Sequence, residues 1–147
     1  MKHELTSAIK PTYVTFEQAK LLKEKGFDLR IKQCYVSKET ILFLYDENNT
    51  LGWCNRNLPK NEYSAPEQWQ VVEWLRVEKG IEVCIIPDSS SQSQLLLRKY
   101  TYSIFTPING ANLHCQIGRK ENGDISYFLK PQEAYSAAFD YVLNSLI

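Results

Sequence analysis

The segment SAPEQWQVVEWLRVEKGI, residues 64–81, constrains the fold most, because it predicts a helix whose apolar residues surround its axis. Ser64 is the expected N-cap, Glu67 completes a capping box, and Pro66 fits the first turn. Gly80 supplies a left-handed stop. A helix on the surface of a sheet normally carries a single apolar stripe. This helix therefore needs neighbours on several sides, since its apolar positions are Trp69, Val71, Val72, Trp74, Leu75 and Val77.

Two arrangements would satisfy such a helix. In the first, it lies centrally above a sheet, between two other helices of the same chain, and its tryptophans fill the gaps. In the second, part of its surface meets another protein or a second copy of the chain, because tryptophan buries a large area at protein contacts. The candidate contact residues in this second arrangement are Trp69, Trp74 and Val77.

Two further helices are predicted. The segment TFEQAKLLKEKGF opens with Thr15 and Gln18 at capping-box spacing and ends at Gly26. The segment PQEAYSAAFDYVLNSLI, residues 131–147, carries a broad apolar arc. The first two helices share a pattern of cap, Glu-Gln, apolar positions and Lys-Gly, which suggests two helix-plus-β-hairpin units followed by a C-terminal helix.

Runs rich in β-branched and aromatic residues lie between the helices. RIKQCYV and TILFLYD form an expected hairpin, with LGWCN as its third strand. IEVCIIP and LLLRKYTYSIFT follow the second helix, and Asn122-Gly123 marks a hairpin between NLHCQIGR and DISYFLK. The class is therefore α+β, a mostly antiparallel sheet with three helices. We expect residues 1–12 to form an N-terminal arm and residues 13–147 to form a single domain.

Composition bounds the function classes. The 147 residues suit one domain, and 17 basic against 17 acidic residues leave no net charge to attract nucleic acid or anionic membranes. The chain has no signal-peptide pattern and no apolar run of membrane-spanning length. The expected location is cytoplasmic, with reduced thiols at Cys34, Cys54, Cys84 and Cys115.

Catalytic and metal chemistry finds little support in the residues. On a strand, His114 and Cys115 would point to opposite faces, so we interpret Cys115 as a core thiol and His114 as a surface imidazole. Cys34, Cys84 and Cys115 each lie in apolar runs, which favours packing over zinc binding. No Gly-rich phosphate loop, GxSxG or HExxH motif is present. We expect no catalytic residues, no metal and no cofactor, and an enzyme with a cryptic site is the third hypothesis.

A basic and aromatic strand supports an alternative function. Arg98 and Lys99 precede Tyr100 and Tyr102, and aromatic side chains beside basic ones can stack on single-stranded bases. This pattern predicts a nucleic-acid-associated binding module. Tyrosine on strands also serves ordinary sheet packing, so nucleic acid remains the second hypothesis.

The three helical segments together carry a resemblance. TFEQAKLLKEKGFD, APEQWQVVEWLRVEKGI and PQEAYSAAFDYVLNSLI resemble small uncharacterised proteins encoded by phages, prophages and mobile elements of gut Bacteroidetes. The resemblance covers about a third of the chain and carries no activity or site residues. It implies an accessory protein that works in the host cytoplasm on a protein partner. A non-enzymatic interaction protein, acting on a partner or as a homodimer, is the leading hypothesis.

Overall fold

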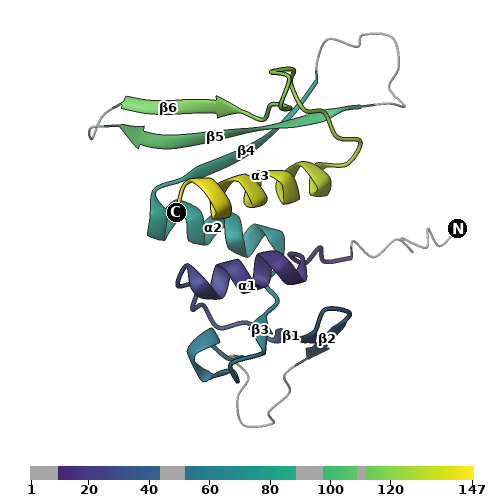
Figure 1. The fold of residues 1–147 in the computed structure, drawn as a ribbon, viewed down its shortest axis with the longest axis vertical. Helices are drawn as coiled ribbons and strands as arrows, with labels where there is room; N and C mark the ends of the chain where they lie inside the picture. Colours follow the sequence, from purple (N-terminus) through teal and green to yellow (C-terminus); the bar gives the residue numbers. More distant parts are fainter. Residues whose placement is uncertain (1–9, 44–51, 89–97, 109–111) are drawn as a thin grey trace, which may run out of the picture.

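Three helices lie between two small antiparallel sheets (Figure 1). The computed structural model describes residues 10–43, 52–88, 98–108 and 112–147. The helices are α1 (Phe16–Glu24), α2 (Gln68–Lys79) and α3 (Pro131–Ser145). This arrangement confirms the α+β class and the C-terminal helix. Most of the predicted N-terminal arm and of the polar segment Asp88–Gln94 lies outside the described residues.

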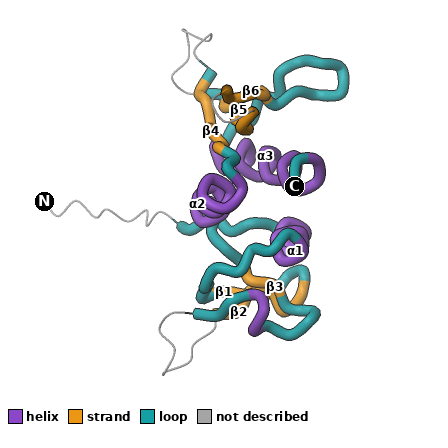
Figure 2. Tube along the Cα trace, turned by 90° about the vertical axis from the view of Figure 1, so that its left-hand side faces the viewer, coloured by secondary structure: helices purple, strands orange, loops and turns teal. Residues whose placement is uncertain are grey.

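Each sheet has three strands and packs on a different helix. The first is ordered β2-β1-β3, from β1 (Gln33–Ser37), β2 (Thr40–Phe43) and β3 (Tyr63–Ser64), and it lies against α1. The second is ordered β4-β5-β6, from β4 (Glu82–Pro87), β5 (Tyr100–Ile108) and β6 (Asn112–Ile117), and it lies against α3. The quarter-turn view places α2 to one side of α1 and α3 (Figure 2).

The helix ends follow their capping residues, with one correction. Thr15 and Gln18 form the predicted capping box of α1, and Gly80 ends α2 in the left-handed conformation with φ 66°. The prediction that Ser64 caps α2 is wrong, since Glu67 is the N-cap. Ser64 pairs with Cys34 in the sheet, so its backbone is already committed to β3.

Two strand predictions are also wrong. LGWCN does not form the third strand of the first sheet, because Trp53 makes only an isolated bridge to Ile31 and β3 occupies that edge. DISYFLK makes isolated bridges through Ile125 and Phe128 in place of a strand. The hairpin turn itself is present, with Gly123 at φ 88° and its N–H donating to the Lys120 carbonyl. After the turn the chain does not continue alongside β6, because Phe128 exchanges two backbone hydrogen bonds with Tyr100 of β5.

One buried cluster joins both sheets through the helix layer. It contains Leu22 of α1, Leu75 of α2 and Phe139 of α3, none of which is exposed. Trp74 reaches across to Phe27, with ring centroids 5.4 Å apart. Most of the apolar surface of α2 therefore packs against other elements of the same chain.

A buried glutamine holds α1 against α3. The Gln18 side chain is fully buried, and its Nε2 donates to the Ser136 carbonyl (3.0 Å), the Ser136 hydroxyl (2.9 Å) and the Asp140 carboxylate (2.8 Å). Its Oε1 accepts from the Thr15 N–H at 3.1 Å as part of the cap. One side chain thus starts a helix and ties it to another helix.

We expect Gln18→Leu to lower the free energy of unfolding by about 2 kcal/mol, because it removes the Gln18 half of the capping box and the hydrogen bonds to Ser136 and the Asp140 carboxylate. Gln70→Leu is the matched control, since Gln70 completes the capping box of α2 and shows no hydrogen bond to another helix among the described residues. It should cost less than about 1 kcal/mol. Urea unfolding followed by circular dichroism measures both, and equal losses would contradict a role for Gln18 between the helices.

Candidate functional site

The outward side of α2 carries two exposed apolar side chains. Trp69 is 63% exposed and Val77 is 64% exposed, and they lie eight residues apart, or about 12 Å along the axis. Between them, Glu73 and Arg76 form an ion pair with oxygen–nitrogen distances down to 2.6 Å. We call Trp69, Glu73, Arg76 and Val77 the α2 ridge. It combines apolar ends with a charge-balanced centre.

Trp74, the third predicted contact residue, does not belong to the α2 ridge. It is only 3% exposed and packs against Phe27, while the Lys79 ammonium lies 5.1 Å from its ring centroid. The indole of Trp69, in contrast, is largely exposed, and its N–H donates to the Glu67 carboxylate at 2.8 Å. The two tryptophans therefore have different roles, one in the core and one at the surface.

The four residues of the basic and aromatic strand differ in exposure. Arg98 and Lys99 are exposed and Tyr100 is half-buried, with the Lys99 ammonium 6.0 Å from the ring centroid of Tyr127. Tyr102 is only 7% exposed and belongs to the core cluster beneath β5. A ring in that position cannot offer its face to a base, so the four predicted residues do not form one stacking surface.

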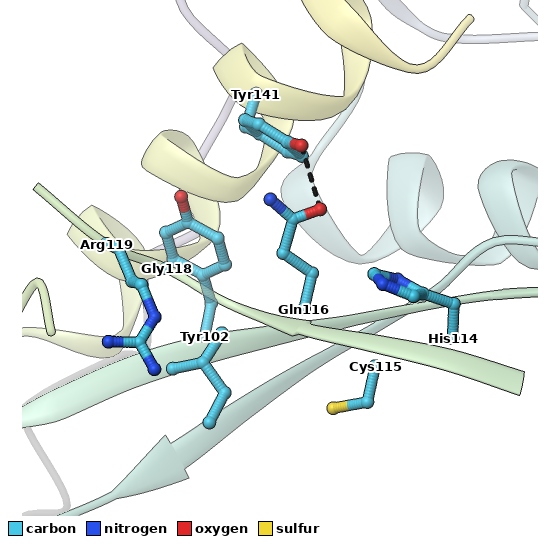
Figure 3. A pocket seen from close by; sticks show the side chains of 8 residues that line it. Tyr102, His114, Cys115, Gln116, Gly118, Arg119 and Tyr141 are labelled. Atoms are coloured by element: carbon cyan, nitrogen blue, oxygen red, sulfur yellow. Dashed lines mark hydrogen bonds between the residues drawn. The ribbon is translucent and has the colours of Figure 1, made fainter. Parts of the chain in front are cut away.

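A cleft of about 390 Å³ lies between β6 and α3 (Figure 3). Gln116 stands at its centre and accepts a hydrogen bond at Oε1 from the Tyr141 hydroxyl, at 2.8 Å. His114 lies at one end and Arg119 at the other. The residues that line the cleft are Tyr102, His114, Cys115, Gln116, Ile117, Gly118, Arg119 and Tyr141.

The cleft reverses one prediction for β6. Cys115 was expected in the core, but it is exposed and points away from Gln116, on the other side of the strand (Figure 3). Gln116 instead points toward α3, where it accepts the hydrogen bond from Tyr141. Strand alternation separates neighbouring side chains but does not say which set meets the helix. The prediction that His114 is a surface imidazole is confirmed by its exposure.

Tyr102 forms the floor of the cleft. Its hydroxyl makes no hydrogen bond to any described residue, although nine-tenths of the residue is buried. Burial raises the pKa of the Tyr102 phenol, and the nearby Tyr141 and Asp140 side chains raise it further, so Tyr102 stays protonated at neutral pH. Gly118 makes room for this ring, because a Cβ there would lie 2.5 Å from two ring carbons. The sequence gives no signal for this pairing.

The thiols do not form a metal centre in the described parts of the chain. All four cysteines are free, with Cys34 and Cys54 buried. Burial raises the pKa of the Cys34 and Cys84 thiols, which lowers their reactivity. Among the residues that the structure describes, no three or more His, Cys, Asp or Glu side chains come together as metal ligands.

Comparisons with protein-family models, curated proteins and solved structures found no match to this chain. Within residues 10–43, 52–88, 98–108 and 112–147, no helix combines the length and the apolar character needed to cross a membrane. The function is therefore inferred from the α2 ridge and the cleft themselves.

Proposed function

We propose that this chain is a non-enzymatic interaction protein that self-associates through the α2 ridge. The observation that carries the proposal is the exposure of Trp69 and Val77 on one side of a helix whose Val71, Trp74 and Leu75 are buried. Large apolar side chains that stay exposed on a surface are typical of protein contacts. The helical resemblance adds the accessory role in a phage or mobile element, and that role is part of the proposal.

The charges of the ridge favour a second copy of the chain as the occupant. In a twofold arrangement each residue meets its counterpart in reverse order. Two antiparallel α2 helices centred between Glu73 and Arg76 bring Glu73 of each copy beside Arg76 of the other. Val77 then approaches Val72 of the other copy, and Trp69 covers the last turn of the opposite α2. The order of charges on the ridge is thus complementary to itself.

Light scattering between about 1 µM and about 1 mM tests this association, since small interfaces dissociate in that range. We expect a concentration-dependent dimer for the natural chain and a monomer for Trp69→Ala and Val77→Glu. Glu78→Gln is the control, because Glu78 is exposed on the opposite side of α2. A natural chain that stays monomeric throughout this range would overturn the proposal.

Two charge-reversal variants, Glu73→Arg and Arg76→Glu, test the antiparallel arrangement of the two α2 helices. Glu73→Arg leaves two positive charges on the ridge and Arg76→Glu leaves two negative charges, so each variant alone should be monomeric. Mixed in equal amounts, the two variants should form a heterodimer, because every contact across the twofold axis then joins opposite charges. A mixture as monomeric as its components would contradict the antiparallel arrangement.

A further inference from the structure

We propose that the cleft between β6 and α3 binds the carboxylate of a small organic acid, independently of the α2 ridge. The groups that face it are mainly hydrogen-bond donors. The Gln116 carbonyl oxygen is already engaged by Tyr141, which turns the amide nitrogen of Gln116 toward Tyr102 in the cleft (Figure 3). The Tyr102 hydroxyl has no hydrogen-bond partner among the described residues. An amide N–H and a phenol O–H can each donate to one oxygen of a carboxylate.

The backbone of β6 adds further donors. The Gly118 N–H bonds to the Tyr102 carbonyl, at 3.0 Å, and in an antiparallel pair only alternate residues turn their amides toward the neighbour. Ile117 and Cys115 therefore turn both their N–H and their C=O groups to the free edge of the sheet. Among the described strands none lies along that edge, since β6 is the last in the order β4-β5-β6.

The charges around the cleft fit a singly charged acid. The cationic side chain of the lining is Arg119, which stands at one end with its guanidinium on the Cys115 side of the strand and donates to the Gly123 carbonyl at 2.7 Å. The nearby negative group is Asp140, whose carboxylate is bound by Gln18 from α1 at 2.8 Å. A phosphate would bring more negative charge than the one guanidinium can neutralise.

The size and the walls of the cleft select a compact, partly apolar acid. A volume of about 390 Å³ lies within the range of small-molecule sites. Tyr141 supplies aromatic surface beside the donors, while the Ile117 side chain lies on the Cys115 side of the strand. Because the Tyr102 hydroxyl is preorganised by Gly118 and by burial, it needs no rearrangement to bind.

Titration with benzoate, followed by the nitrogen–proton NMR signals of the Gln116 side chain and the Ile117 backbone, tests the site. We expect saturable shifts with a dissociation constant on the order of 1 mM. Benzamide, a neutral molecule of the same shape, should bind at least about tenfold more weakly, since charge-assisted hydrogen bonds are the stronger ones. No saturation with benzoate, or equal binding of benzamide, would overturn the proposal.

Tyr102→Phe is the decisive variant, because it keeps the buried ring and removes only the hydroxyl. It should weaken benzoate binding roughly tenfold. Tyr35→Phe is the matched control, since it removes the hydrogen bond of another buried phenol, to the Val14 carbonyl at 2.7 Å, away from the cleft. Unchanged affinity in Tyr102→Phe, in a variant shown to be folded by its NMR spectrum, would overturn the assignment. Trp69→Ala should leave benzoate binding unchanged. The carboxylate site and self-association through the α2 ridge can therefore be disproved independently of each other.

Discussion

Phe139→Ala should lower the free energy of unfolding by about 3–5 kcal/mol, the usual cost of truncating a fully buried phenylalanine. Phe139 is 0% exposed, lies on α3 and stacks on Tyr135 with ring centroids 6.1 Å apart. It belongs to the cluster that also contains residues of α1, α2 and the β4-β5-β6 sheet. Removing the ring leaves a cavity where the elements meet, and whole domains are stable by only about 5–15 kcal/mol.

Urea unfolding followed by far-ultraviolet circular dichroism measures this loss. Tyr127→Ala is the matched control, because it truncates an aromatic side chain that is 43% exposed. It should cost less than about 1 kcal/mol. A similar small loss for Phe139→Ala would mean that α3 is not anchored in the common core, and would contradict the packing described above.

Gly52→Ala should cost about 3 kcal/mol, of which only about 1–2 kcal/mol comes from the backbone conformation. Gly52 has φ 81°, and a Cβ there would lie 2.6 Å from the Ile31 carbonyl oxygen. That carbonyl cannot move freely, because Ile31 and Trp53 exchange two backbone hydrogen bonds of 3.0 Å each. The substitution therefore strains the backbone bridge between Ile31 and Trp53.

Gly26→Ala separates the two contributions. Gly26 has φ 88°, close to that of Gly52, but nothing lies within 4 Å of the added Cβ. It should therefore show the backbone cost alone, about 1–2 kcal/mol. Chemical denaturation of both variants checks the difference, and equal losses at the two glycines would argue against the close contact with Ile31.

Local signals in the sequence predicted most of the secondary structure. The Thr15–Gln18 capping box and the stop at Gly80 act within one turn of the chain, so their chemistry is visible in a few consecutive letters. Ser64 shows the limit of such signals. It fits an N-cap as well as Glu67 does, and its pairing with Cys34, thirty residues away in the chain, decided between them.

The sites depended on contacts that no local pattern contains. Periodicity showed that α2 is apolar on several sides, but only its packing against Phe27 placed Trp74 inside and left Trp69 exposed. Alternation showed that Cys115 and Gln116 point apart, while α3 decided which of them faces the helix. The cleft likewise requires Gly118 to meet Tyr102 across two strands.

By itself, then, the sequence determined the α+β class, the three helices and the caps of α1, because these follow from short-range hydrogen bonding and from hydrophobic period. The tertiary structure decided which face of each element is buried. That choice depends on long-range packing, which brings residues such as Gln18 and Asp140 together from opposite ends of the chain. The α2 ridge and the cleft are two of the surfaces that this packing left uncovered in the described part of the chain.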